Sequence, residues 1–295
     1  MMRNTACLAI VAGLVGGVAL SVFAQESERL PLAVVGVGES ATERIAAVTA
    51  DATRRKLYVG TLSRDEKRRG LLVYDLGEHG ELVGEPRAYS DHPDPLPAGQ
   101  HSTVASLWLD AERRLLFLGP QSSQPKFSRG LVMYELDDAG EPRGEPRAVD
   151  SGNPHHAIDA FAPHPVLPTL YAVGWGGEGV FALSRDERGR VVENGRRTPF
   201  GNYGGYAVAV RADGTRLYRG TYPSVVEVCQ LDPQGKVVLP PRSTPIPGGP
   251  QEYLRFVARP RGLYFAASDR TLQWLPLDAT GDVAGPVRST ALVGV

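Results

Sequence analysis

A motif that recurs five times constrains the fold of this chain more than any other feature of its sequence. Each copy opens with a polar turn and continues into an apolar run that contains Leu-Tyr, or Leu-Phe in the second copy. The copies cover residues 51–60, 110–119, 164–174, 213–220 and 259–266. The later copies follow one another at a spacing close to the roughly 40–50 residues of a propeller blade, whereas the earlier ones require loop insertions.

Each repeat contains four strand-like runs separated by turns. An apolar run precedes the motif, and a third run, alternating or fully apolar, follows it, as in residues 71–76 and 131–136. A glycine then recurs at a fixed place in a hairpin turn, where a positive φ is expected: Gly80, Gly140, Gly189, Gly235 and Gly281. A short polar run with a proline closes the unit, which suits an outer edge strand because its unpaired side needs no N–H donor.

Four antiparallel strands per repeat, five times over and without helical periodicity, predict an all-β fold. We expect a β-propeller with five clear four-stranded blades plus an extra N-terminal strand at residues 31–37. A sandwich would not repeat the same four strands five times, and a solenoid would show a shorter period. The expected blades cover approximately residues 40–92, 101–151, 155–201, 205–247 and 251–292, within a single domain at 25–295.

The extra strand has no obvious partner, because the fifth repeat has a fourth strand of its own. It either adds to that blade or belongs to a ring whose later blades are missing from the sequence. The abrupt apolar end at residues 292–295 favours the second interpretation.

Residues 1–24 have the layout of a secretory signal peptide. Arg3 is followed by a run of apolar and small residues, and Val22 and Ala24 are small residues at the positions that precede a cleavage site. We expect cleavage before Gln25 and a periplasmic or extracellular location. The alternative is an uncleaved membrane anchor, because the apolar run approaches the about 20 residues that span a bilayer. After cleavage no stable membrane span is expected.

Charge and cysteine content exclude several classes of protein. The chain has 32 basic and 33 acidic residues, and this balance argues against a nucleic-acid partner. Cleavage would leave Cys229 as the single cysteine, so a disulfide within the chain is excluded, and its apolar surroundings indicate a buried structural thiol. The sequence has no glycine-rich phosphate loop, nucleophile elbow or calcium-loop pattern, and no cofactor is expected.

The repeats resemble those of a known family. Leu-Tyr-Val-Gly at residues 57–60, followed by Thr61, and the segments 70–76 and 80–82 are similar to the YVTN-type repeats of bacterial lactonase-like propellers, the 6-phosphogluconolactonase-related family. Residues 153–156, Asn-Pro-His-His, add to the likeness. The resemblance covers most of residues 40–290 and implies a propeller fold. It also implies that hydrolysis of a lactone is one activity to consider, although propellers carry many unrelated functions.

The first strands of the five repeats are expected to line a central channel. Polar residues near the start of these strands would then converge at one rim, which gives the candidate catalytic residues His155, His156, Asp159, Glu252 and Arg255. In an enzyme, His155 or His156 would transfer a proton, Arg255 would stabilise a carboxylate or an oxyanion, and Glu252 or Asp159 would orient them. Alternatively, these side chains only hydrate the channel.

A metal site is a further possibility at this rim, because His155, His156 and Asp159 are suitable ligand types. Adjacent residues on a strand point to opposite faces, however, so the two histidines cannot easily bind one ion together, and no metal is expected. The remaining candidate binding residues are His101, Glu43, Tyr206, Tyr253 and Trp175. Two hypotheses result: a scaffold that binds a small molecule or a protein at the channel mouth, and a lactone hydrolase with its site at the channel rim.

Overall fold

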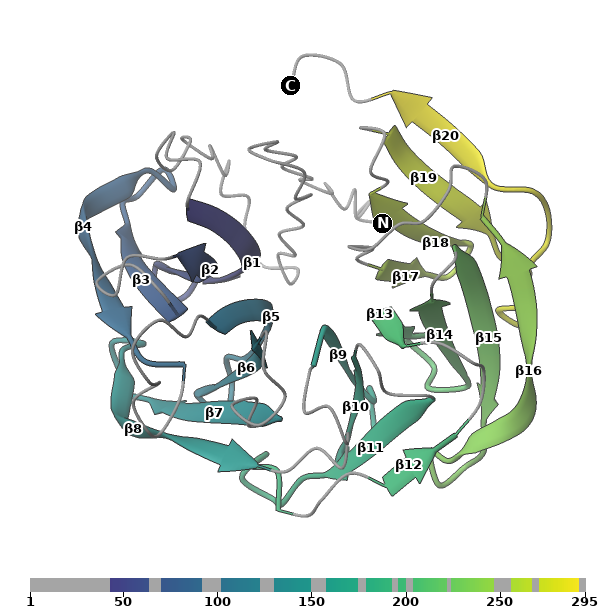
Figure 1. The fold of residues 1–295 in the computed structure, drawn as a ribbon, viewed down its shortest axis with the longest axis horizontal. Coiled ribbons are helices and arrows are strands. Elements are labelled where there is room, and N and C mark those ends of the chain that lie inside the picture. The colour runs from purple at the N-terminus through teal and green to yellow at the C-terminus, as the bar shows by residue number, and fades with distance from the viewer. Residues whose placement is uncertain are drawn as a thin grey trace, which may run out of the picture.

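Five blades, each a four-stranded antiparallel sheet, make up the protein in a computed structural model, and a single pairing of Leu62 with Thr103 joins the sheets of blades 1 and 2 (Figure 1). The structure describes residues 43–63, 70–91, 102–122, 130–149, 158–174, 179–192, 196–199, 204–221, 224–246, 256–266 and 271–291. The blades lie side by side around a centre in sequence order. The predicted all-β propeller with five blades is therefore confirmed, whereas the extra strand expected at residues 31–37 lies outside the described residues.

The strands follow the same order in every blade, from the centre outward (Figure 1). Blade 1 contains β1 (Glu43–Asp51), β2 (Lys56–Ser63), β3 (Gly70–Leu76) and β4 (Leu82–Tyr89), and blade 2 contains β5 (Ser102–Asp110), β6 (Leu115–Ser122), β7 (Leu131–Leu136) and β8 (Pro142–Val149). Blade 3 contains β9 (Ala160–Pro163), β10 (Thr169–Val173), β11 (Val180–Ser184) and β12 (Arg196–Thr198). Blade 4 contains β13 (Gly205–Val210), β14 (Arg216–Thr221), β15 (Val225–Leu231) and β16 (Val237–Pro245), and blade 5 contains β17 (Phe256–Arg259), β18 (Gly262–Ala266), β19 (Thr271–Pro276) and β20 (Arg288–Ala291).

The hairpin turn between the third and fourth strand of each blade has the backbone that the glycine pattern predicts. The five repeated glycines have φ values between 76° and 87°. In blades 2 to 5 an aspartate opens this turn and its side chain accepts hydrogen bonds from backbone N–H groups within the turn, as Asp278 does from Thr280 and Asp282. Such local bonds from aspartate stabilise turns.

The hydrophobic core lies between the blades, because successive side chains of a strand point to opposite faces. In the Leu-Tyr motif the leucine packs against the preceding blade and the aromatic residue packs against the following one. Leu217 of blade 4 thus belongs to the cluster shared with blade 3, and Tyr218 belongs to the cluster shared with blade 5. The same alternation orders the clusters between blades 1 and 2 and between blades 2 and 3.

The aromatic residue of the motif also makes a directional bond to the following blade. The hydroxyl of Tyr58 donates to the carbonyl of Gly140 at 2.8 Å, that of Tyr171 to Gly235 at 2.5 Å, and that of Tyr218 to Gly281 at 2.9 Å. Each acceptor is the positive-φ glycine of the next blade's hairpin turn. Burial raises the pKa of Tyr218 to about 12, so its hydroxyl keeps its proton and acts as a donor. The repeated Leu-Tyr motif therefore joins adjoining blades through a hydrogen bond. We call this bond, from the tyrosine hydroxyl to the turn glycine of the next blade, the tyrosine latch.

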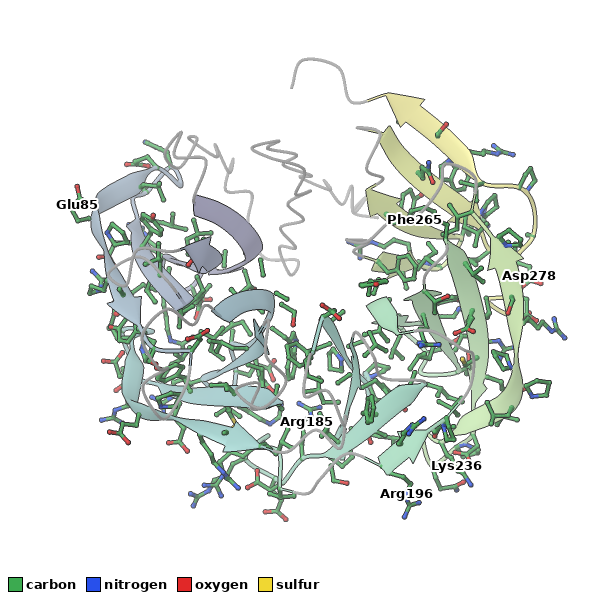
Figure 2. The ribbon with its side chains drawn as sticks, in the orientation of Figure 1. Glu85, Arg185, Arg196, Lys236, Phe265 and Asp278 are labelled. Carbon is green, nitrogen blue, oxygen red and sulfur yellow. The ribbon has the colours of Figure 1, made fainter. Side chains whose placement is uncertain are left out.

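Blade 2 has Phe117 at this position and so lacks the latch to blade 3. Phe117 stacks on Trp108 at a centroid distance of 4.8 Å, and the guanidinium of Arg185, from blade 3, lies 5.2 Å from the Trp108 ring (Figure 2). Arg185 also forms an ion pair with Asp110 of blade 2 at 3.3 Å. The stack of Phe117 on Trp108 lies within blade 2, and Arg185 crosses this interface with a cation–π contact and an ion pair in place of the tyrosine hydrogen bond.

Two further observations concern predictions from the sequence. Cys229 is fully buried in the cluster between blades 3 and 4, and burial raises the pKa of its thiol to about 12, which confirms a structural thiol.

The part of the chain that the structure describes includes no helix that is long and apolar enough to cross a membrane.

The tyrosine latch leads to a prediction on stability. Tyr218→Phe removes the donor and leaves the Gly281 carbonyl without it, so the free energy of unfolding should fall by about 1–2 kcal/mol. Urea denaturation of the purified protein would measure this loss. Tyr264→Phe, at the same motif position in blade 5, is the control: no following blade is present among the described residues, so a change below about 0.5 kcal/mol is expected. Equal losses in both variants would contradict the latch.

Candidate functional site

The two ends of the blades differ in what they can contribute to a site. At one end lie the short turns that join the first to the second strand and the third to the fourth. At the other end the innermost strands begin and the longer connections lie. Two of the residues proposed from the sequence, Asp159 and Tyr206, belong to this second end, where β9 and β13 begin side by side at the centre (Figure 1).

The structure describes three of the ten proposed site residues. Asp159 and Tyr206 are described in full, and Glu43 is described only as the first residue of β1, where it pairs with Ser63. The others lie outside the described residues, and their convergence stays a prediction: His101, His155, His156, Trp175, Glu252, Tyr253 and Arg255.

Asp159 and Tyr206 come from neighbouring blades at the same end of the molecule. Asp159 immediately precedes β9, is 6% exposed, and donates its backbone N–H to the Val173 carbonyl at 2.9 Å. Tyr206 is the second residue of β13 and is half-buried. Asp159 and Tyr206 thus lie at the starts of the inner strands of adjoining blades, and their convergence on one site stays a prediction.

A buried ion pair of blade 4 lies against Gly205, the first residue of β13. Arg219 of β14 is 0% exposed, and its Nη1 donates to Oε2 of Glu227, on β15, at 2.6 Å; Glu227 is 6% exposed. Burial lowers the pKa of Arg219, and the neighbouring Glu227 carboxylate acts in the opposite direction. Removing two charges from water is costly, so such a pair is weak as a device for stability.

The backbone of β13 is adapted to Arg219. A Cβ atom on Gly205 would lie 2.8 Å from Nε of Arg219 and 2.9 Å from Cβ of Val173, which is too close for any side chain. Gly205 thus lets the guanidinium lie against the first residue of the inner strand, next to Tyr206. Val173, on the other side of Gly205, is the residue that receives the backbone bond of Asp159.

The sequence analysis missed Arg219 and Glu227, although a signal for them was present. At the position of Arg219 the other four blades have Val59, Leu118, Ala172 and Phe265, and opposite Glu227 they have Leu72, Val132, Phe181 and Gln273. A comparison of the repeats strand by strand would therefore have shown a charged pair where the other blades are apolar or neutral. The pair was overlooked because Arg219 and Glu227 each have apolar neighbours along their strands.

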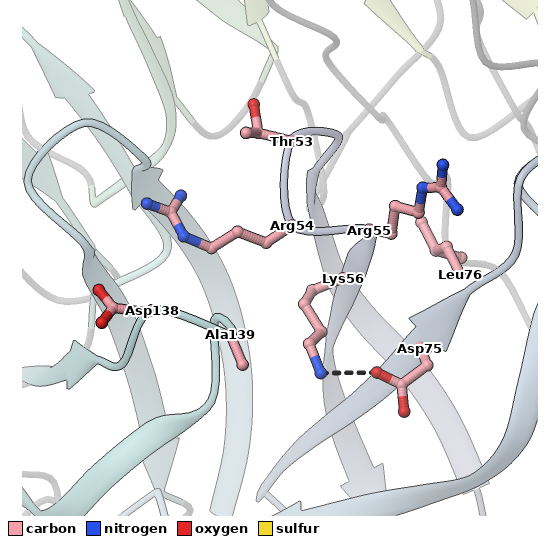
Figure 3. Close-up of a pocket in the computed structure, with 8 residues that line it drawn as sticks. All are labelled: Thr53, Arg54, Arg55, Lys56, Asp75, Leu76, Asp138 and Ala139. Carbon is pink, nitrogen blue, oxygen red and sulfur yellow. Dashed lines mark hydrogen bonds and ion pairs between the residues drawn. The ribbon is translucent and has the colours of Figure 1, made fainter.

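A second group of charges lies at the turn end, between blades 1 and 2. Nζ of Lys56 contacts Asp75 at 2.6 Å and also Glu141, and Arg87 contacts Asp75 at 2.8 Å and Glu141 at 2.6 Å. The hydroxyl of Tyr89 donates to Glu141 at 2.7 Å. The group borders a surface groove of about 510 Å³, whose lining is shown in Figure 3: Thr53, Arg54, Arg55, Lys56, Asp75, Leu76, Asp138 and Ala139.

The charges of this second group satisfy one another. Hydrogen bonds from Arg87 and Lys56 lower the pKa of Asp75 to about 2. Burial alone would raise the pKa of Glu141, but its bonds from Arg87, Lys56 and Tyr89 outweigh burial and lower it. Because Glu141 of blade 2 pairs with Lys56 and Arg87 of blade 1, we interpret the group as an electrostatic joint between blades 1 and 2.

The remaining candidates for chemistry among the described residues have structural roles. His164, which occupies the place of an aspartate in other repeats, accepts at Nδ1 from the backbone N–H groups of Val166 and Leu167 and so caps its turn. Within the described ranges, no three or more His, Cys, Asp or Glu side chains lie close enough together to hold a metal ion. His155 and His156, from the metal alternative, lie outside those ranges.

Comparison with known proteins agrees with the geometry of the blades. The most similar solved structures include a protein from Lactobacillus plantarum, at 18% identity and a TM-score of 0.63, covering 84% of this chain and 72% of that one. A periplasmic gluconolactonase from Pseudomonas aeruginosa has 15% identity, a TM-score of 0.60 and coverage of 83% and 69%. The chain is a β-propeller that resembles lactonase-like proteins in its fold.

A third structure supports the same statement. It is a putative 6-phosphogluconolactonase from Bacteroides uniformis, with 16% identity, a TM-score of 0.60, and coverage of 81% of this chain and 68% of that one. No known family profile matches the sequence, and no curated protein matches it. At these identities the likeness establishes the fold, which confirms the resemblance expected from the repeats, and leaves the activity to be argued from the site.

Proposed function

We propose that this protein is an exported β-propeller that binds a small polar ligand at the channel mouth formed by blades 3 and 4. The observation that carries the proposal is the buried Arg219–Glu227 pair beside the start of the inner strands. At the same position the other four blades pack uncharged residues, so the fold itself does not require charges there. A costly ion pair confined to one blade is better explained by a ligand than by stability.

The side chains of Arg219, Asp159 and Tyr206 suggest the class of ligand. A guanidinium presents several donors in one plane and suits a carboxylate or neighbouring hydroxyl groups. Asp159 supplies a carboxylate that accepts from a hydroxyl, and Tyr206 supplies an aromatic face with a polar tip. Together they suit an oxygen-rich molecule with several hydroxyl groups, with or without a carboxylate. A sugar acid or its lactone has this composition.

Replacing the ion pair by apolar residues of similar size separates ligand binding from stability. The double variant Arg219→Met with Glu227→Leu should unfold at the same temperature as the native protein or a higher one, because no unpaired charge remains. Its affinity for D-gluconate, measured by calorimetry, should fall at least about tenfold, the effect of losing one charged hydrogen bond.

The matched control is Arg242→Met with Asp282→Leu, an exposed pair at the turn end of blades 4 and 5. This control should bind D-gluconate as the native protein does. Unchanged affinity in the Arg219 and Glu227 double variant, or a native protein that binds neither D-gluconate nor its lactone, would argue against the proposal.

A second candidate function is lactone hydrolysis at the same mouth. It is favoured by the names of two structural neighbours, a gluconolactonase and a putative 6-phosphogluconolactonase. Water would add to the lactone carbonyl, the ring C–O bond would break, and a proton would pass to the ring oxygen. Following the sequence, His155 or His156 would move the proton, Arg255 would stabilise the oxyanion, and Glu252 or Asp159 would orient them.

Single alanine variants test the hydrolase. With D-glucono-1,5-lactone as substrate and pH-stat detection of the acid, at least one of His155→Ala, His156→Ala and Arg255→Ala should lower kcat about 100-fold or more. Rates equal to the native rate in all three variants, or a native rate equal to that of buffer, would exclude this function while leaving the binding proposal standing.

Export forms part of the proposal because of the signal-peptide pattern at residues 1–24. Expression of the whole chain in a Gram-negative host should place the protein in the periplasmic fraction or the medium. Intact mass should correspond to a chain that begins at Gln25. A full-length chain that stays in the membrane fraction would instead support the uncleaved anchor.

A further inference from the structure

A strongly basic groove lies at the turn end between blades 2 and 3, at the other end of the blades from the channel mouth. Its volume is about 370 Å³, which falls within the roughly 300–1,000 Å³ of small-ligand sites. Five arginines and two glutamates line it, so the lining has a net charge of +3. The arginines are Arg113, Arg114, Arg143, Arg188 and Arg190.

A groove at the equivalent place between blades 1 and 2 shows which of these arginines belong to the repeat (Figure 3). Its lining includes Arg54 and Arg55, which stand in blade 1 where Arg113 and Arg114 stand in blade 2. This pair of arginines is therefore a feature that both repeats share. It does not by itself distinguish the groove between blades 2 and 3.

The other three arginines are absent from the groove between blades 1 and 2. One lies on the fourth strand of blade 2, and two lie in the hairpin turn of blade 3. The arginines and the residues at the equivalent positions are Arg143 for Val83, Arg188 for Ala139, and Arg190 for Glu141. Because the first groove forms without these three positive charges, the fold does not require them in the second.

Two of the three have no carboxylate to neutralise them. Arg143 and Arg188 are exposed, and their guanidinium groups form no hydrogen bond or ion pair with any residue that the structure describes. Arg143 belongs to blade 2 and Arg188 to blade 3. The groove thus has an unmatched positive charge from each of the two blades that form it.

The remaining three arginines are held by carboxylates and keep donors to spare. The pairs are Arg113 with Asp110 at 3.2 Å, Arg114 with Asp138, and Arg190 with Asp186 at 2.8 Å and Glu135 at 3.9 Å. A guanidinium has five N–H donors, so these contacts leave some of them available. The carboxylates therefore orient the three side chains without using up their capacity to bind an anion.

The hairpin turn of blade 3 is adapted to the arginine of blade 2. A Cβ atom on Gly189 would lie 2.4 Å from Cδ of Arg113, so the arginine stem could not lie there beside any larger residue. Gly189 stands between Arg188 and Arg190 in the turn. The contact therefore brings arginines of both blades together at one place.

We propose that this groove binds a ligand with two neighbouring phosphate groups, one held by Arg143 of blade 2 and the other by Arg188 of blade 3. Guanidinium groups bind phosphate through two parallel hydrogen bonds. The arginines reach the groove from two blades, and a phosphate group, with three acceptor oxygens that do not lie in one plane with its phosphorus, can accept from more than one of them. The two oxygens of a carboxylate lie in one plane and suit this arrangement less well.

Calorimetry on the purified protein at low ionic strength tests the proposal, with inorganic pyrophosphate as the probe and citrate as the comparison anion. Pyrophosphate should bind at least tenfold more tightly than citrate. The double variant Arg143→Gln with Arg188→Gln should bind pyrophosphate at least about tenfold more weakly, because two charged hydrogen bonds are lost. Its unfolding temperature should match that of the native protein, because both side chains are exposed and have no partner.

The matched control is Arg259→Gln with Arg261→Gln. These two arginines are also exposed and lie at the turn end, but on blade 5, which does not form the groove. The control removes the same charge and should change the affinity for pyrophosphate less than about twofold, because distant surface charges are screened. An equal loss in the control, citrate that binds as tightly as pyrophosphate, or a native protein that does not bind pyrophosphate would overturn the proposal.

Vesicles distinguish the two sources from which such phosphate groups could come. Phosphatidylcholine vesicles with and without phosphatidate are sedimented together with the native protein and the double variant. Sedimentation that requires phosphatidate, Arg143 and Arg188 would assign the phosphates to lipid headgroups. Native protein that binds pyrophosphate but stays in the supernatant would assign them to a soluble compound.

Discussion

The contact between adjoining blades determines how the rest of the structure is arranged. Each blade has two faces that must be covered, and in blades 2 to 4 neighbouring blades cover both, through leucine on one face and an aromatic residue on the other. In blades 1, 3 and 4 the aromatic residue is a tyrosine, and its hydroxyl donates to the carbonyl of the positive-φ glycine in the turn of the next blade. Because apolar packing is non-directional, the hydrogen bond is what fixes the register between one blade and the next.

The repeat alone was enough to predict much of this architecture. It predicted the strand order, the turn glycines with positive φ, and the outer strand that contains proline, because each depends on local spacing and backbone conformation. The structure adds why the Leu-Tyr pair recurs. Local pattern cannot show that a tyrosine in one blade bonds to a glycine more than sixty residues later, such as Gly235 for Tyr171.

The candidate site was harder to predict for a different physical reason. Polar residues near the start of the inner strands were found by counting from each turn, and Asp159 and Tyr206 do lie at adjoining blades. Arg219 and Glu227 were not predicted as site residues. Each is a charged residue in a strand that is otherwise largely apolar, and such a strand is interpreted as part of the core. Burial of both charges follows from the packing of blade 4 against blade 3, which no single segment encodes.

The replacement of tyrosine by Phe117 changes the kind of bond at one joint between blades. Blades 1 and 2 share a continuous sheet through the pairing of Leu62 with Thr103, and blades 3 to 5 are joined by two tyrosine hydrogen bonds. Between these two groups, the guanidinium of Arg185 in blade 3 lies over the Trp108 ring and pairs with the Asp110 carboxylate, both of blade 2. This joint therefore includes a charged side chain held between a ring and a carboxylate, whereas every other joint among the described blades includes a bond from a neutral hydroxyl to a backbone carbonyl.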